Sequence, residues 1–202
     1  DGAEGDDFRT VGGDYYKPTD ADYEANCDEA RQLLADAGYP NGEGFPVVEY
    51  LYNTSDAHKA VAEALQFMWE EELGVKVTLN NQEWAAFLQT RKDGDYSIAR
   101  NGWIADYNDP ISFLDMWMTG GGNNDAQYAN DDYDALIKQA KTTTDNAERM
   151  DLLHQAEDKL IGEDSVLAPL YFYTQKYMLA DGIEGMYYCP LGYFFFGCTH
   201  QA

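Results

Sequence analysis

Two aspartates, Asp106 and Asp109, stand three residues apart in the segment "ARNGWIADYNDP", which spans residues 99–110. They follow a run typical of a β-strand, "YSIAR", and share the segment with Trp103 and Tyr107. A carboxylate beside bulky aromatic side chains loses contact with water, which costs free energy unless a cation or a hydrogen-bond donor is its partner. The segment therefore predicts a partner for each aspartate, and we expect one of these partners to come from outside the chain.

Asp109 has a partner close by in the sequence. It directly precedes Pro110, and a cap residue followed by proline at the first helical position is a typical helix start. We predict that Asp109 caps the short helix that contains "ISFL" and that Asp106 binds a ligand, with helix capping by Asp106 as the alternative. A carboxylate at the end of a strand suits an ammonium group, because ammonium is a compact donor that needs charged acceptors.

Two carboxylates near an aromatic side chain could also serve as general acid and general base, as in glycoside hydrolysis. Little else favours catalysis, because the sequence has no nucleophile motif and no phosphate-binding loop. The histidines and cysteines show no metal-ligand spacing. These residues are His58, His154, His200, Cys27, Cys189 and Cys198. We therefore predict a binding protein rather than an enzyme, with no catalytic residue, metal or cofactor.

The charge balance excludes one class of partner. The 202 residues include 37 acidic and 13 basic side chains, which gives a net charge of −24. This field repels phosphate backbones and anionic lipids, so we expect no nucleic-acid binding. High acidity keeps an exported protein in solution, and it is also compatible with a salty habitat. No apolar run approaches the roughly 20 residues that cross a bilayer.

The cysteines leave one question open. Cys189 and Cys198 bracket "CPLGYFFFGC", whose proline and glycines could turn the chain back on itself. A disulfide there would indicate an oxidising compartment, and the sequence does not decide whether it forms. Cys27 falls on a predicted helix, where we expect it to be a small packing residue.

Helical and strand patterns alternate along the chain. This order predicts an α/β fold in which helices pack on a largely parallel or mixed sheet. The predicted helices cover residues 23–37, 56–73, 83–92, 111–118, 131–142 and 146–161, and the predicted strands cover 47–53, 75–79, 96–103 and 166–180. The apolar faces predicted for the first two helices are Ala30, Leu33, Leu34 and Ala37, and Ala60, Ala64, Phe67 and Met68. Ligands of such sheets bind beyond the carboxyl ends of strands, which is where the two aspartates lie.

Several segments together resemble one family. "YNTSD-H", "LGV-V", "NQEW--FL-TR", "ARNGW-ADYNDP-SFL" and "APLYFY" match, in order and spacing, the oligopeptide-binding proteins of bacterial peptide ABC transporters, within the extracellular solute-binding proteins of family 5. The resemblance runs from about residue 24 to residue 174, and its specificity lies in the combination. It implies a periplasmic-binding-protein-like lobe with a mixed sheet flanked by helices.

Members of this family have two large lobes that close around an extended peptide, and this chain resembles the second lobe. The resemblance implies three parts. Residues 1–22 are expected to be an irregular segment from the inter-lobe region, residues 23–165 the peptide-binding lobe, and residues 166–202 a return strand and tail. The tail would pack on a first lobe that this chain lacks, and without that lobe its aromatic residues would form an exposed apolar patch.

The resemblance also implies roles for individual residues. The aspartate of "ADY", Asp106, is expected to bind the α-ammonium of a peptide. Arg91, Arg100 and His58 stand where some relatives place basic side chains near the peptide carboxylate, and an arginine can grip a carboxylate with two parallel hydrogen bonds. The alternative for either arginine is to neutralise nearby acids such as Asp93 or Glu83, and for His58 a solvated or capping role.

Aromatic side chains complete the expected site. Trp103 is expected to wall the cleft, with a place in the core as the alternative. Tyr171 and Tyr173 lie on the predicted return strand, where relatives use a tyrosine to hold the peptide backbone. A period of two residues puts these tyrosines on one face and Phe172 on the other.

The function that the resemblance implies is the substrate-binding component of an ABC importer, which captures short peptides and delivers them to the permease subunits in the membrane. Such proteins are exported, as periplasmic proteins or as lipoproteins on the outer face of the cytoplasmic membrane. The alternatives are the same scaffold with a different solute (a dipeptide, a nickel complex, haem or a sugar), a carboxylate-dependent hydrolase, and a structural surface module.

Overall fold

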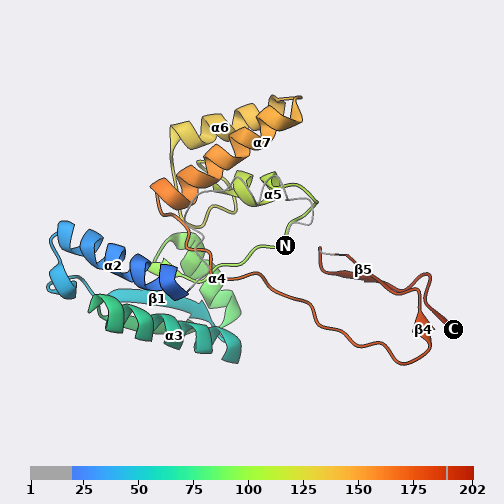
Figure 1. Cartoon of the computed structure of the whole chain (residues 1–202), viewed down its shortest axis with the longest axis horizontal. Helices are drawn as coiled ribbons and strands as arrows, with labels where there is room; N and C mark the ends of the chain where they lie inside the picture. The colour runs from blue at the N-terminus through green and yellow to red at the C-terminus, as the bar shows by residue number, and fades with distance from the viewer. Residues whose placement is uncertain (1–19, 190) are drawn as a thin grey trace. The chain divides into compact units, whose positions relative to one another are not determined.

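The computed structural model describes residues 20–189 and 191–202 of the chain, with side chains from residue 23 onward. The described residues divide into two compact units. Of the described residues, the sheet unit contains residues 20–101 together with the loop Gly122–Tyr128, and the helical unit contains Gly102–Gly121 and the residues from Ala129 onward. Helices and strands are labelled in Figure 1.

Three parallel strands form the centre of the sheet unit. They lie in the order β2-β1-β3, with Val48 opposite Val77 and Tyr50 opposite Ile98. Their bounds are Val48–Asn53 for β1, Val77–Gln82 for β2 and Ile98–Ala99 for β3. The predicted α/β class is confirmed. Of the largely parallel or mixed sheet that the sequence predicted, these three strands form a parallel one. The third strand is shorter than predicted, because it pairs with β1 through two residues only.

Helices connect these strands, as parallel pairing requires. α3 (Asp56–Leu73) follows β1, α4 (Trp84–Asp93) follows β2, and both are confirmed predictions. α2 (Asp20–Asp36) and the short turn η1 (Pro40–Gly42) precede β1. Because β2 and β3 lie on opposite sides of β1, right-handed crossovers place α3 and α4 on opposite faces of the sheet.

One core of the sheet unit lies under α3. The side chains of Tyr50 and Tyr52 point to the same face of β1, and they pack with Ala62, Val75 and Val77. Partly buried side chains surround these five: Leu34, Phe45, Val48, Leu65, Trp69, Leu73 and Leu79. The alternation predicted for residues 75–79 is confirmed.

The predicted apolar face of α3 is wrong. Ala62 is fully buried and Trp69 packs on the core, whereas Phe67 is 65% exposed and Ala60 and Ala64 also face solvent. Met68, the fourth residue predicted for this face, is 38% exposed. Apolar residues occur almost all round this helix, so helical periodicity fits more than one face, and the bulk of the tryptophan decides which face is buried.

The predicted face of α2 is partly wrong. Leu34 packs on the core, but Leu33 is 63% exposed and Ala37 faces solvent. Cys27 is buried, as expected for a packing residue. Arg31 takes a place on this face instead, where its guanidinium donates to the side chain of Glu72 at the end of α3.

Two glycines allow the turn between α2 and β1 to pack closely against the end of α3. Gly42 and Gly74 have φ of +74° and +68°, which glycine adopts without strain. A Cβ on Gly74 would collide with the backbone carbonyl of Asn41, and a Cβ on Gly42 would lie 2.5 Å from the backbone of Gly74. The predicted helix 56–73 ends at Gly74, and the close approach explains why no side chain fits there.

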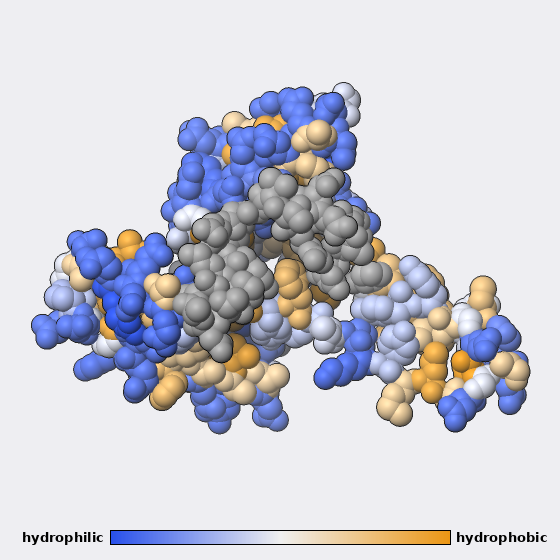
Figure 2. Space-filling view, viewed as in Figure 1, coloured by the Kyte–Doolittle hydropathy of each residue, from blue (hydrophilic) through white to orange (hydrophobic). Residues whose placement is uncertain are grey.

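Five helical segments build the described part of the helical unit. α6 (Asp131–Thr142) and α7 (Asn146–Glu157) lie side by side (Figure 1), and η3 (Asp158–Glu163) continues α7 as a turn of π-helix. α5 (Ile111–Leu114) runs into the short turn η2 (Asp115–Trp117). All three helices predicted in this region are confirmed. Figure 2 shows that hydrophilic residues dominate the visible surfaces of α6 and α7.

Tyr133 holds the core of the helical unit together. Its ring is fully buried, and its hydroxyl donates to the backbone carbonyl of Leu114 at 2.6 Å. The start of α6 is capped by Asn130, whose side chain accepts from the N–H groups of Asp132 and Tyr133. The other buried hydrophobic side chains come from α5, η2, α6, α7 and η3: Ile111, Leu114, Met116, Trp117, Ile137, Ala140, Leu152, Leu153, Ala156 and Leu160.

The long strand predicted for residues 166–180 does not form. This segment has no regular secondary structure, and all its residues from Ala168 onward are exposed. A β-strand exists only where a neighbour accepts and donates its backbone hydrogen bonds, and no such neighbour lies along this segment in the described part of the chain. Its alternation of side chains is therefore not enough to make it a strand.

Two short antiparallel ladders end the chain. β4 (Ile183–Glu184) pairs with β7 (His200–Gln201), and β5 (Tyr187–Cys189) pairs with β6 (Tyr193–Phe195). Cys189 and Cys198 are both free, so the disulfide that the sequence allowed is not formed. The chain does turn back on itself, but β-pairing places Cys189 opposite Tyr193 rather than beside the second cysteine. The predicted segment boundaries at residues 22 and 165 stay predictions, and residues 1–19 lie outside the described residues.

Candidate functional site

The predicted site residues fall into two groups, one in each unit. Arg91, Arg100 and His58 belong to the sheet unit, whereas Trp103 and Asp106 belong to the helical unit. Tyr171 and Tyr173 lie on the exposed segment that follows η3.

The carboxyl edge of the sheet brings Arg100 and His58 together. β1 ends at Asn53, β3 is followed by Arg100, and His58 stands in the first turn of α3. The backbone N–H of Arg100 donates to Leu51 at 2.8 Å, and its Nη1 lies 3.5 Å from Oδ1 of Asn53. Two residues that are 42 positions apart in the sequence therefore meet because parallel strands end at one edge.

His58 is held in its neutral form. Burial lowers the pKa of its imidazole, the positive charge of Arg100 lowers it further, and a hydrogen bond with the backbone of Asn53 opposes them only in part. Because the ordinary pKa of histidine is already near 6.5, the ring is uncharged at neutral pH. An anionic group arriving beside Arg100 and His58 would reverse this balance and favour the protonated ring.

Arg91 is surrounded by acceptors from its own unit. Its Nε donates to Oδ2 of Asp125 at 2.7 Å, and its Nη1 donates to Oδ1 of Asn101 at 3.0 Å. The same Nη1 lies 3.4 Å from the carbonyl oxygen of Arg100, and the guanidinium carbon lies 5.1 Å from the ring centre of Phe87. The acid that neutralises Arg91 is therefore Asp125, and not the Asp93 or Glu83 that the sequence suggested.

The two aspartates of the opening segment have different surroundings. Oδ1 of Asp109 accepts from the backbone N–H of Ile111 at 2.9 Å and from Nη2 of Arg149 at 2.8 Å. The predicted capping role of Asp109 is confirmed. Asp106 is exposed, its backbone N–H donates to Ser112, and its carboxylate makes no hydrogen bond or ion pair within the described part of the chain.

The pKa of Asp109 is lowered. Its burial alone would raise the pKa, but the hydrogen bonds from Arg149 and from the backbone of Ile111, with the charge of Arg149, outweigh burial. A carboxyl group with a depressed folded pKa stabilises the fold above its ordinary value of 3.8, and this stability is lost as the pH falls through the folded value.

Replacing Arg149 with methionine is expected to raise the pKa of Asp109, since burial would then act with less opposition. At neutral pH the change should cost about 2 kcal/mol of stability, the usual value of a hydrogen bond to a charged group. Titration of the Asp109 carboxyl by NMR in both forms measures the shift. Lys59→Met is the matched control, because its pair with Glu63 is more than half exposed and should contribute no more than about 0.5 kcal/mol. An unchanged pKa of Asp109 would contradict the assignment.

Trp103 is half-buried, and the nitrogen of its indole ring is inaccessible to solvent without an acceptor in the described residues. A buried indole N–H normally finds a partner, so this donor is open to an acceptor that the described residues do not supply. Tyr171 and Tyr173 lie on the same face, as the period of two residues predicted, with their rings 5.1 Å apart and their hydroxyls at 3.2 Å.

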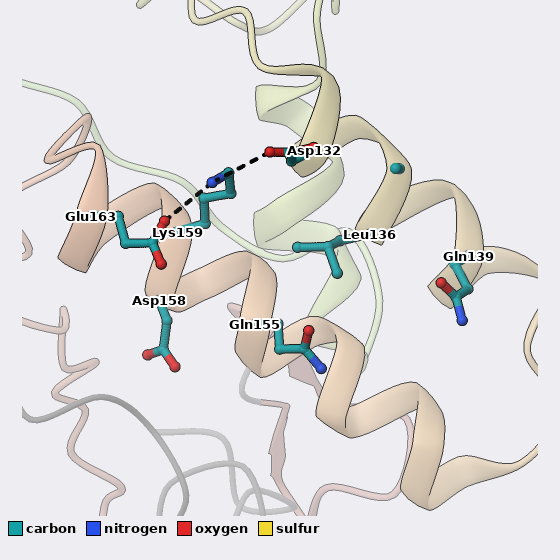
Figure 3. Close-up of a pocket in the computed structure, with 8 residues that line it drawn as sticks. Asp132, Leu136, Gln139, Gln155, Asp158, Lys159 and Glu163 are labelled. Atoms are coloured by element: carbon teal, nitrogen blue, oxygen red, sulfur yellow. Dashed lines mark hydrogen bonds and ion pairs between the residues drawn. The ribbon is translucent and has the colours of Figure 1, made fainter.

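A groove of about 470 Å³ lies in the helical unit between α6 and the end of α7 (Figure 3). Lys159 lies within it, 3.1 Å from Glu163 and 4.0 Å from Asp132. The other lining residues are Ala135, Leu136, Gln139, Gln155 and Asp158. None of the predicted site residues lines this groove, so we assign it no part in the candidate site.

Three residues of the sheet unit matter to the site but were not predicted: Asn53, Asn101 and Asp125. Two of them could have been found, because Asn53 ends "VVEYLYN" and Asn101 follows "YSIAR", and polar residues just after strands lie at the ligand edge of a parallel sheet. Asp125 had no such signal, since it stands in the glycine-rich loop "GGGNND" far along the chain.

Comparison with known proteins decides the family. The model of the bacterial extracellular solute-binding proteins, family 5 (middle region), matches residues 3–125. The chain belongs to this family. The match includes the whole of α3, α4 and the carboxyl edge of the sheet, and it includes the segment that carries Asp106.

Individual relatives agree with the family assignment. The dipeptide-binding protein DppE of Bacillus subtilis is 39% identical over 191 residues, which are 94% of this chain and 34% of that protein. The periplasmic oligopeptide-binding protein OppA of Salmonella typhimurium is 40% identical over 158 residues, which are 78% of this chain and 29% of that protein. This family 5 chain thus spans about a third of the length of these relatives.

The fold agrees with solved structures of the family. The structure of Haemophilus influenzae OppA in complex with the peptide RPPGFSPFR superposes with a TM-score of 0.62 at 37% identity, over 66% of this chain and 26% of that one. None of the helices in the described part of the chain is long and apolar enough to cross a membrane.

Proposed function

We propose that this chain is a ligand-binding lobe of the substrate-binding component of an ABC importer, and that the ligand is a short peptide. The observation that carries the proposal is the contrast between two neighbouring carboxylates. Asp109 has two partners, whereas the carboxylate of Asp106 is exposed and has none within the described residues. An exposed carboxylate without a partner in the described residues suits the amino terminus of a peptide.

The carboxyl edge of the sheet, taken by itself, is suited to a carboxylate ligand. Arg100 and a neutral His58 lie together there, and both can donate hydrogen bonds to a peptide carboxylate. Tyr171 and Tyr173 present two exposed hydroxyls that could bond to a peptide backbone. Side chains of the peptide would then lie in hydrated pockets, which allows a broad range of sequences.

The relatives supply the class of ligand. One relative is named for dipeptides, another for oligopeptides, and a third was solved with a nonapeptide bound. We infer from these names that the whole protein binds peptides without chemical change, works with permease subunits in the membrane, and is exported. We also infer that residues 166–202 pack on a further lobe of the same polypeptide, since their aromatic side chains are exposed here.

Calorimetry of the natural protein that carries this chain tests the proposal. We expect members of a pool of short peptides to bind, and their N-acetylated forms to bind about 100-fold more weakly, because acetylation removes the ammonium charge that pairs with the carboxylate. Equal binding of the free and acetylated peptides would remove Asp106 from its proposed role. Failure of every peptide to bind would favour another solute on the same scaffold.

A further inference from the structure

We propose that Arg91 is a positioning residue, which orients the ligand-binding Arg100 without touching the ligand itself. This inference rests on the proposed function, because it concerns the same peptide-carboxylate site. The basic character of Arg91 suggests a direct contact with the ligand, and the inference replaces that contact with a positioning role. It also adds Asp125 and Asn101 to the residues on which peptide binding depends.

The guanidinium of Arg91 is already engaged within the sheet unit. The side chain is 12% exposed, and its partner Asp125 is 15% exposed. One edge of the guanidinium faces Asp125 through Nε, another faces Asn101 through Nη1, and the ring of the fully buried Phe87 lies at 5.1 Å. Turning Arg91 toward a ligand would leave the Asp125 carboxylate buried without its cation. The free energy that this costs would oppose the gain from an ion pair between Arg91 and the ligand.

Arg91 contacts the carbonyl group of Arg100 and the side chain of the next residue. Nη1 lies 3.4 Å from the carbonyl oxygen of Arg100 and 3.0 Å from the side chain of Asn101. The N–H of Arg100 is bonded to Leu51 in β1. The peptide groups before and after Arg100 are thus both held, and the Arg100 side chain leaves the edge of the sheet in one direction, toward Asn53.

Asp125 links a second segment of the chain, through Arg91, to the backbone around Arg100. It belongs to the loop Gly122–Tyr128, which returns to the sheet unit after the chain has left it at Asn101. The carbonyl of Asp125 accepts from the hydroxyl of Tyr96 at 2.8 Å, and Asn124 closes the loop by bonding both backbone groups of Tyr128. Arg91 therefore ties this loop to the residue that follows Arg100.

The substitution Asp125→Asn separates the two roles of Arg91, because they predict opposite signs. The substitution is close to isosteric and removes only the charge that holds Arg91. If Arg91 is a positioning residue, binding of peptides with a free carboxylate should weaken by about 10-fold, the lower limit for partners that orient a ligating group. If Arg91 contacts the ligand, freeing it from Asp125 should leave binding unchanged or make it tighter.

The measurement is calorimetry of the natural protein with one peptide in its free-carboxylate and C-terminally amidated forms. We expect Asp125→Asn to weaken binding of the carboxylate form only, because Arg100 grips that group. Asp95→Asn is the matched control, since it removes an exposed charge near the same strand and should change neither form. Tyr96→Phe is a milder variant, which removes one anchor of the loop and should weaken the carboxylate form by about threefold.

Three results would overturn the inference. Unchanged or tighter binding by Asp125→Asn would show Arg91 as a ligand contact, and an equal loss for both peptide forms would show a structural role alone. Additive losses in Arg91→Gln, Arg100→Gln and the double variant would also contradict it, because a residue that acts through Arg100 has no effect once Arg100 is gone. If the unsubstituted protein binds no peptide, the proposed function itself fails, which is a different outcome from all of these.

Discussion

Replacing Asp106 with asparagine in the natural protein is expected to weaken the binding of peptides with a free amino terminus by about 100-fold, since truncating one partner of a desolvated charge pair costs about 3 kcal/mol. The fold should not change, because the carboxylate of Asp106 has no partner within the described residues and its backbone bond to Ser112 remains. Calorimetry gives the affinity, and thermal unfolding gives the stability.

The acetylated peptide is the internal control for this substitution. Without an ammonium group it gains nothing from the carboxylate, so the unsubstituted and Asp106→Asn proteins should bind it with the same affinity. A large loss of thermal stability in Asp106→Asn, with equal losses for both peptides, would instead assign Asp106 to the structure of the segment around Ser112.

Replacing Phe87 with alanine is expected to cost about 3–5 kcal/mol of stability in the sheet unit, the usual range for a large aromatic removed from a core. Phe87 is fully buried, stacks on Trp84 with ring centres 5.8 Å apart, and lies beside the Arg91 guanidinium. Native-state hydrogen exchange of the amides in α4 and β1 measures the free energy of opening of this unit.

Trp84→Ala is the control for Phe87, because it removes a larger ring that is 53% exposed. It leaves no cavity and should cost less than about 1.5 kcal/mol, the value of an aromatic pair beyond buried area. If the two substitutions cost the same, burial of Phe87 does not determine the stability of the sheet unit, and its part in holding Arg91 would need another basis.

Much of the fold could be read from local patterns. Helical and strand patterns of the residues predicted α3, α4, α6 and α7 and the first two strands, because these signals act between residues close in the sequence. The chosen face of α3 failed because apolar residues surround that helix, and periodicity then has no single solution. The strand predicted for residues 166–180 failed because a strand needs a partner, and no local signal reports whether one is present.

In the candidate site, too, local contacts could be predicted from the sequence and distant contacts could not. Asp109 was assigned to capping from its place before Pro110, and the bond to Ile111 is a local one that the sequence can predict. Its second bond, to Arg149, joins residues 40 positions apart and carries no sequence signal. The same holds for Asp125, which pairs with Arg91 across 34 positions in place of the nearer Asp93 and Glu83.

By itself, the amino-acid sequence determined the α/β class, the family, and the set of residue types at the ends of the strands. Only the tertiary structure decided which of these residues form ion pairs or hydrogen bonds with one another. Two charges meet when the backbone brings them within a few ångströms, and parallel strands bring distant segments to one edge whatever their separation in the chain. For this reason the structure distinguishes Asp109 and Arg91, which have partners within their own units, from Asp106, whose carboxylate has none in the described residues.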